Sequence, residues 1–249
     1  MQQPEKNVWV VDLGLIAYEP ACGLQRELVE ARKASAIPDV LLLCEHPHVI
    51  TLGRNGKLEN LRAGEQLLAQ MNVEFHQTNR GGDITYHGPG QIVGYPIFDL
   101  AEHRRDVRWY VEQLEELMIR ASADFGVIAH RSDANHGVWL DGDAGEEKLA
   151  ALGVHLSRWV SSHGFAYNVS TDLRFFDLIV PCGVAGKRAT SLERAVGHAL
   201  PLDVVRERLV AHFASVFERQ PVHISREELE QRLRVADEVH SHAAAGDVG

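Results

Sequence analysis

The chain has 249 residues, enough to bury a sizeable core as one domain or a tight pair of domains. Hydrophobic residues make up 45% and charged residues 24%, which is ordinary for a soluble globular protein, and no apolar run is long enough to span a bilayer. The net charge of −10 argues against nonspecific nucleic-acid binding, so we expect neither nucleic-acid nor membrane partners.

The N-terminal segment and the cysteines predict the compartment. The polar segment Met1–Asn7 lacks the apolar core of a signal peptide. The three cysteines are odd in number and widely spaced, which argues against a disulfide framework and fits a reducing compartment. We therefore expect a cytoplasmic protein.

The hydrophobic pattern predicts short strands interspersed with helices. In chain order these are a strand over Val8–Leu13, a helix over Tyr18–Lys33, strands over Val40–Cys44 and Val49–Leu52, a helix over Glu65–Met71 and a strand over Val73–Gln77. There follow a strand over Ile92–Phe98, a helix over Asp106–Phe125, strands over Val138–Leu140, Ala150–Ser157 and Trp159–Val169 with a turn at Ser161–Gly164, and helices over Pro201–Phe217 and Arg226–Val235. The tail from about Asp237 has nothing to bury and is expected to be mobile. Because regular β-α-β units are absent, this order predicts a single-domain α+β fold with a mixed β-sheet flanked by helices.

The segment Arg80–Gln91 holds four glycines and a proline within twelve residues. Gly81 and Gly82 allow a positive φ or a close approach of the backbone to a ligand, and Gly88-Pro89-Gly90 forms a second bend. This pattern predicts a rigid trough that faces a ligand, with Arg80 at one end and His87 at the other. The alternative is a pair of tight turns in a β-meander.

Cys182 and Lys148 are the candidate catalytic side chains. Cys182 stands between Pro181 and Gly183, where a constrained turn can project a nucleophilic sulfur; the alternative is a small buried hydrophobe. A thiol needs a nearby cation or base to lower its pKa, and Lys148, at the edge of an apolar strand, is the candidate. Lys148 could instead be a solvated surface residue. His87 and His163 are alternative bases.

No motif indicates a cofactor or a metal. The segment Gly183–Thr190 has the wrong spacing for a phosphate-binding loop, and no strand–loop–helix unit surrounds Gly88-Pro89-Gly90. Pro47 and the lack of a second Cys/His pair argue against a metal site at Cys44, His46 and His48.

Three blocks of sequence resemble the lipoyl(octanoyl) transferases, the octanoyltransferases of protein lipoylation. They are Arg80–Gln91 with Gly94–Ile97, Lys148–Val154 with Arg158–Ala166, and Ile179–Gly183 with Thr190–Leu192. Their order and spacing match that family from about Val8 to Phe217. The resemblance implies a catalytic domain over residues 1–220, followed by an extension over residues 221–249 that consists of a short helix and a mobile tail.

The resemblance also implies a fold similar to the catalytic fold of biotin– and lipoate–protein ligases, and a Cys/Lys pair at Cys182 and Lys148. It implies that the acyl group lies along three segments. Their residues are Arg80, Gly81, Gly82, Asp83, Ile84, Thr85, Tyr86 and His87, then Ala151, Leu152 and Gly153, then Gly164, Phe165 and Ala166.

The implied activity is transfer of octanoate from octanoyl-acyl carrier protein to a lysine of a lipoyl domain, without ATP or any cofactor. Cys182 would carry the acyl group as a thioester, and the acceptors would be lipoyl domains of 2-oxoacid dehydrogenase complexes and the glycine cleavage H protein. Because carrier proteins are acidic and this chain has a net charge of −10, we expect a local basic rim. Its candidates are Arg54, Lys57, Lys187 and Arg188.

Three other functions fit parts of the pattern. An ATP-dependent lipoate–protein ligase would use the same scaffold and would not require Cys182. A non-catalytic module that binds acyl carrier protein would use the trough without turnover. A metal-dependent hydrolase is suggested by the fourteen histidines alone, and metal analysis would test it.

Overall fold

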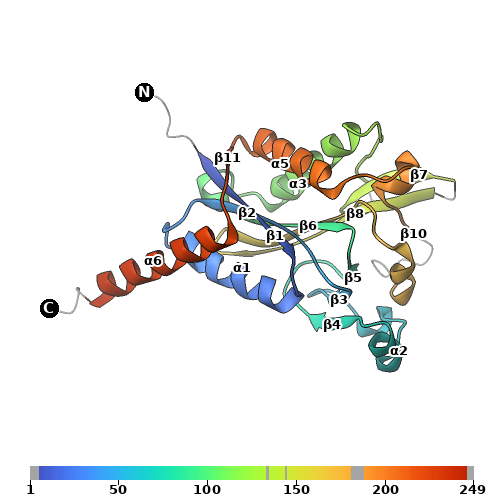
Figure 1. The fold of residues 1–249 in the computed structure, drawn as a ribbon, viewed down its shortest axis with the longest axis horizontal. Helices are drawn as coiled ribbons and strands as arrows, with labels where there is room; N and C mark the ends of the chain where they lie inside the picture. Colours follow the sequence, from blue (N-terminus) through green and yellow to red (C-terminus); the bar gives the residue numbers. More distant parts are fainter. Residues whose placement is uncertain (1–5, 133–134, 144, 181–187, 246–249) are drawn as a thin grey trace.

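The computed structural model of the chain describes residues 6–132, 135–143, 145–180 and 188–245, and the side chains as far as residue 236 (Figure 1). Within these ranges the polypeptide forms two sheets and six α-helices. None of the helices in the described part is both long and apolar enough to cross a membrane.

The larger sheet has eight strands. Its order is β10 (Arg188–Ala189), β8 (Gly145–Ser157), β9 (Val160–Asn168), β6 (Gln91–Ile97), β2 (Asp39–Glu45), β1 (Asn7–Leu15) and β11 (Gln220–His223), and β7 (Val138–Gly142) also pairs with β8. The pairs β1–β2, β1–β11 and β8–β10 are parallel, and the others are antiparallel. The predicted α+β fold with a mixed sheet is therefore confirmed.

Helices cover both faces of this sheet because its central strands are apolar on both faces. Leu41 and Leu43 of β2 pack with α3 (Val107–Ala123) and α5 (Leu202–Phe217). Their neighbours Val40 and Leu42 pack with α1 (Tyr18–Lys33) and α6 (Arg226–Ala245). The alternation of side chains along a strand thus produces two cores. The helices α3 and α5 lie on one face of the sheet and α1 and α6 on the other (Figure 1).

The smaller sheet carries the glycine-rich segment. Its order is β4 (Glu74–Gln77), β3 (Val49–Leu52) and β5 (Ile84–His87), and α2 (Glu65–Gln70) lies beside it. Gly81 N donates a hydrogen bond to Val154 O at 2.9 Å, so the connection between β4 and β5 lies against β8 of the larger sheet. The two sheets therefore meet at the predicted trough.

The C-terminal segment is part of the same core. β11 pairs with β1, and Ile224, Leu229 and Leu233 are buried against α1. The segments before and after residue 220 share one sheet. The predicted boundary between a catalytic domain over residues 1–220 and an extension over residues 221–249 therefore stays a prediction. The helix α6 runs to Ala245, ten residues beyond the predicted end at Val235, and the mobility of the tail stays a prediction. Ion pairs between residues four apart, such as Arg226–Glu230 at 2.8 Å, stabilise its first turns.

The turn between β8 and β9 differs from its prediction. It lies at Arg158 and Trp159, whose φ angles are +49° and +72°. The segment Ser161–Gly164, expected as a turn, lies within β9 and pairs with Gly153–Leu156. Ser161 is buried in this strand and donates its hydroxyl to Pro96 O at 2.7 Å.

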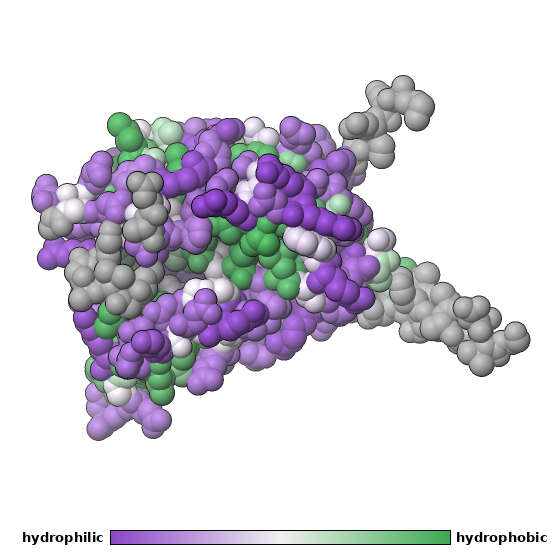
Figure 2. All heavy atoms as spheres, turned by 180° about the vertical axis from the view of Figure 1, so that it is seen from behind, coloured by the Kyte–Doolittle hydropathy of each residue, from purple (hydrophilic) through white to green (hydrophobic). Residues whose placement is uncertain are grey.

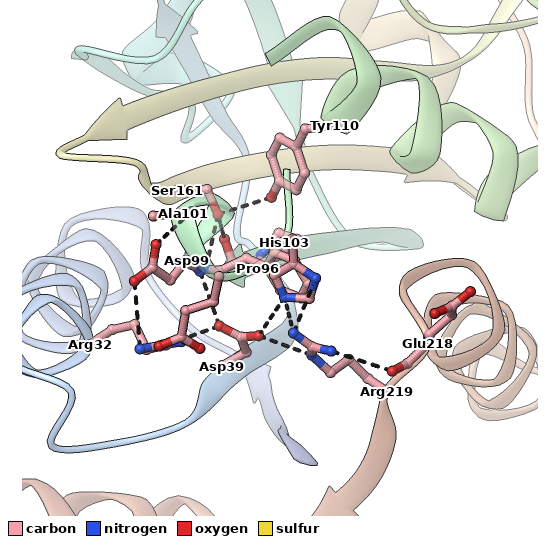
Figure 3. A network of polar contacts seen from close by, with 12 residues as sticks. Arg32, Asp39, Pro96, Asp99, Ala101, His103, Tyr110, Ser161, Glu218 and Arg219 are labelled. Carbon is pink, nitrogen blue, oxygen red and sulfur yellow. Dashed lines mark hydrogen bonds and ion pairs between the residues drawn. The ribbon is translucent and has the colours of Figure 1, made fainter. Parts of the chain in front are cut away.

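A buried ionic network ties the layers together near the first residue of β2 (Figure 3). Asp39 accepts hydrogen bonds from Arg32 Nε at 3.0 Å, Arg219 Nε at 3.1 Å and the Asp99 amide at 3.0 Å. His103 contacts both Asp39 and Arg219. Burial raises the pKa of the Asp39 carboxyl, but the hydrogen bonds from His103, the Asp99 amide and Arg32, with the charge of Arg32, outweigh it and hold the pKa below its usual value. The ionised carboxylate joins α1 to the strand and to the chain that follows α5.

Candidate active site

A cavity of about 560 Å³ lies between the glycine-rich segment, β8 and α3. Arg80, Gly81, Gly82, Asp83 and Thr85 line one side, and the other lining residues include Lys148, Ala151, Leu152, Gly153, Ala166, Val107, Val111, Trp139 and Arg188. Figure 2 shows the face turned away from the viewer of Figure 1, where apolar atoms gather in a central hollow surrounded by hydrophilic side chains. We call the cavity of about 560 Å³ the acyl cavity, after the acyl group that the resemblance implies along these segments.

A second, small cavity of about 40 Å³ continues the first, which we call the tail pocket. Six residues line both: Arg80, Thr85, Ala151, Leu152, Gly153 and Ala166. The tail pocket adds His87, Gly164 and Phe165 to the lining. The two cavities therefore bring together all residues of the three expected acyl-binding segments except Ile84 and Tyr86.

Ile84 and Tyr86 lie on the opposite face of β5. Both are buried in the core beneath the smaller sheet, and Tyr86 hydrogen-bonds His48 Nδ1 through its hydroxyl at 2.8 Å. Thr85 and His87, the alternate residues, line the cavities. Because successive side chains of a strand point to opposite faces, one strand cannot present all four to a ligand.

Arg80 is a buried cation with a fixed guanidinium. Its Nη2 donates to Thr51 O at 2.6 Å, its Nε to Thr51 Oγ1 at 3.1 Å and its Nη1 to Gly81 O at 3.0 Å. The backbones of Gly153 on β8 and Gly81 in the glycine-rich segment are in close contact. A Cβ on Gly153 would lie 2.7 Å from Gly81 O, so only glycine fits there. Asp83 is turned toward the neighbouring loop and accepts from Asn60 Nδ2 at 2.6 Å.

Lys148 lies on β8 at the other end of the acyl cavity, half-buried. Its Nζ donates to His136 O at 3.2 Å and lies 4.6 Å from the centre of the Trp139 ring. Gly137 has a φ of +134°, and a Cβ there would come within 2.7 Å of Ala150 O and 3.1 Å of Lys148 Cε. The backbone of residues 136–137 therefore lies directly against the lysine side chain.

Glu115 holds that backbone in place, a role that the sequence analysis missed. It is buried on α3, accepts a hydrogen bond from Gly137 N at 2.9 Å and pairs with Arg131 Nε at 3.3 Å. An acidic residue between Leu114 and Leu117, on the apolar face of a predicted helix, was the signal that could have revealed it.

Cys182 lies outside the described residues, as do Pro181, Gly183 and Lys187. The described chain reaches Val180, whose N–H donates to Asn60 O at 2.7 Å. It resumes at Arg188, which lines the acyl cavity, and Ala189 pairs with Lys148. Thr190 N donates to Lys148 O at 2.9 Å. Lys148 is thus adjacent to Ala189 and Thr190, which follow the expected nucleophile in the sequence.

The two histidines considered as bases are buried. Burial lowers the pKa of His87 to about 3, with contributions from His46 and Arg80. Burial also lowers the pKa of His163 to about 3, with contributions from Arg80 and His155. Both imidazoles are neutral at pH 7 and too weakly basic to take a proton efficiently.

The basic rim stays a prediction. Arg54 contacts Asn79 O at 3.2 Å and His155 Nδ1 at 2.8 Å, and Lys57 pairs with Glu59 at 3.4 Å. Arg188 is exposed at the edge of the acyl cavity. In the described ranges no three His, Cys, Asp or Glu side chains are grouped to hold a metal ion, and His46 instead hydrogen-bonds Tyr95 at 2.7 Å.

Residues 17–214 match the family model of the lipoyl protein ligase A/B catalytic domain. The chain is 53% identical to an octanoyltransferase of Solibacter usitatus over 86% of this chain and 94% of that one. It is 49% identical to an octanoyltransferase of Acidobacterium capsulatum, over 85% and 90%.

Two solved structures share the fold. One is a bipartite lipoate protein ligase from Thermoplasma acidophilum, with a TM-score of 0.68 and 15% identity over 94% of this chain and 92% of that one. The other is a lipoate-protein ligase A bound with ATP, with a TM-score of 0.67 and 13% identity over 94% of each chain.

Proposed function

The chain belongs to the lipoyl protein ligase A/B catalytic-domain family and is an acyltransferase that moves octanoyl groups in lipoate biosynthesis, and we propose that it does so through Cys182 and Lys148. The expected family and octanoyl transfer are confirmed by these relatives. The finer steps that follow are part of the proposal. The observation that supports it best is that Lys148 and the glycine-rich segment line one cavity.

The first step is acyl transfer to the enzyme. Octanoyl-acyl carrier protein presents a thioester, and the Cys182 thiolate attacks its carbonyl carbon. The bond from that carbon to the carrier sulfur breaks and a new thioester forms on Cys182. The leaving carrier thiolate takes up a proton from the Lys148 ammonium, so Lys148 is neutral when the second step begins. One thioester replaces another, so no ATP is required. The Lys148 ammonium stabilises the attacking thiolate.

The second step is transfer to the acceptor, a lipoyl domain. The ε-amine of its lysine attacks the octanoyl-Cys182 carbonyl, an amide forms, and the thiolate of Cys182 leaves. The amine must lose a proton in this step, and Lys148 in its neutral form accepts it. The order of these steps predicts ping-pong kinetics. 2-Oxoacid dehydrogenase complexes and the glycine cleavage H protein supply the acceptor domains.

The acyl chain occupies the acyl cavity and the tail pocket. Arg80 supports the corner where β8 meets the glycine-rich segment, and Ala151 and Gly153 leave room for methylenes. A rim of Arg54, Lys57, Lys187 and Arg188 attracts the acidic carrier protein.

An ATP-dependent ligase is the alternative on the same fold, because one similar structure is a ligase bound with ATP. That likeness is at 13% identity, which supports the fold alone, whereas the octanoyltransferases are 42–53% identical to this chain. The transferase is therefore the better-supported function.

Intact mass tests the proposal. The protein is mixed with octanoyl-acyl carrier protein without ATP or acceptor, beside a Cys182→Ala variant. We expect one octanoyl adduct on the wild type, removed by neutral hydroxylamine and absent from the variant. Octanoyl transfer to a lipoyl domain without any adduct would contradict the Cys182 thioester. Transfer that requires ATP and survives in Cys182→Ala would support the ligase.

A further inference from the structure

A third cavity lies behind the tail pocket. It has a volume of about 590 Å³ and is bounded by α1, the segment Gln77–Asn79 and the adjoining ends of β8 and β9. We call it the rear cavity. Its lining is mostly polar and includes Gln25, Asn79 and Ser162.

Tyr18 and His163 are the residues that line both the tail pocket and the rear cavity. The acyl cavity in turn shares its lining with the tail pocket. The three cavities thus follow one another, and two side chains separate the apolar end from the polar one. Both side chains are buried, with 3% of Tyr18 and 7% of His163 exposed.

Hydrogen bonds from segments distant in the sequence fix Tyr18 and His163 between the two cavities. His163 N donates to Gln25 Oε1 of α1 at 2.7 Å, and His163 Nε2 lies 2.8 Å from Asn79 Oδ1. The Tyr18 hydroxyl donates to Thr78 Oγ1 at 3.3 Å. His163 has a φ of +54°, a left-handed conformation that is unfavourable for most residues other than glycine. The surrounding contacts keep His163 in this conformation, which often marks a functional position.

We propose that Tyr18 and His163 form the end wall of the acyl site and set the longest acyl chain that it accepts. This inference rests on the proposed function, because it assumes that the acyl chain runs from Lys148 toward Gly164–Ala166. A chain that reaches the wall can extend no further, since packed interiors yield little to added methylenes. Removing the His163 ring would connect the tail pocket to the rear cavity and admit longer chains.

His163→Gly is the main variant, because glycine takes the left-handed conformation without strain. His163→Asn tolerates the same conformation and keeps part of the wall. Tyr18→Leu opens the wall from α1. Ser162→Ala is the matched control, because Ser162 lines the rear cavity and lies outside the wall.

Two measurements are made on each variant. The first is the dissociation constant of unesterified octanoate, decanoate, dodecanoate and tetradecanoate, by titration calorimetry. The second is kcat/KM for carrier thioesters of the same lengths. In His163→Gly we expect the preference for dodecanoyl over octanoyl to rise about tenfold or more in both measurements, because the overpacking that excludes the longer chain at the wall is relieved. His163→Asn should give a smaller rise, and Ser162→Ala the wild-type ratio.

An unchanged length preference in folded His163→Gly overturns the proposal. If that variant does not fold, Tyr18→Leu decides in the same way. A wild type that binds octanoate but transfers no acyl group would contradict the proposed function, and the binding series would still test the wall.

Discussion

The Nζ of Lys148 lies 4.6 Å from the centre of the Trp139 ring, and the two residues face one another across the β7–β8 hairpin. The aromatic face and the carbonyl of His136 both contact Nζ and hold it at the cavity. The hairpin therefore positions a cation at one end of the acyl cavity.

Replacing this cation should alter the reactivity of Cys182. We expect Lys148→Met to lower octanoyl transfer about 100-fold or more, since a positioned proton-transfer group typically contributes that much. The pH at which Cys182 alkylation by iodoacetamide reaches half of its maximal rate should also rise, because the thiolate loses its neighbouring positive charge. Burial raises the pKa of Cys22 to about 11 and also raises that of Cys44, so both react slowly in the same assay. An identical alkylation profile in the variant would exclude this role.

We expect Glu115 to affect octanoyl transfer indirectly, by positioning Lys148. Glu115→Ala leaves the buried Gly137 N–H without its acceptor and removes one of the two carboxylates that pair with Arg131, at a cost of about 1–3 kcal/mol in unfolding free energy. If Glu115 positions the lysine, the Cys182 alkylation midpoint should shift as in Lys148→Met. Glu112→Ala, on the exposed face of the same helix, is the control and should change neither quantity. A loss of stability with an unshifted midpoint would mean that Glu115 is structural only.

The network around Asp39 predicts acid sensitivity. Its folded pKa lies below the unfolded value, so its contribution to stability is present above about pH 4 and is lost as pH falls through the folded pKa. Asp39→Asn should destabilise the fold at pH 7 by about 3 kcal/mol or more, because Arg32 and Arg219 lose their buried counter-charge.

Urea unfolding at pH 7 and pH 3 measures this effect. The difference between wild type and Asp39→Asn should be large at pH 7 and smaller at pH 3. Equal differences at both pH values would show that the charge of Asp39 contributes nothing.

Substitutions at two neighbouring residues of β5 should affect substrate binding and protein stability separately. Thr85→Leu fills part of the acyl cavity and should raise KM for the octanoyl carrier about tenfold, with little effect on unfolding. Tyr86→Phe removes the hydrogen bond to His48 and should cost about 1 kcal/mol of stability while kcat/KM stays near wild type. Steady-state kinetics and thermal unfolding of both variants check this. The reverse pattern would mean that β5 presents its other face to the substrate.

The sequence by itself determined the features that depend on local patterns. The helix over Tyr18–Lys33 and the strand over Val49–Leu52 have the predicted bounds, because apolar spacing reports which face each element buries. The glycine-rich segment and its companion blocks identified the family, since their close backbone approaches allow few other residues.

The tertiary structure decided which side chains meet. Only the pairing of β5 with β3 shows that Thr85 faces the cavity and Tyr86 the core. Gln25, Asn79 and His163 come from three distant segments, so no local pattern could place His163 between the tail pocket and the rear cavity. The turn at Arg158–Trp159 was likewise set by the register of β8 against β9 and not by the small polar residues after it. Contacts between residues far apart in the chain depend on the packing of whole elements, and that packing is specified only when the fold is complete.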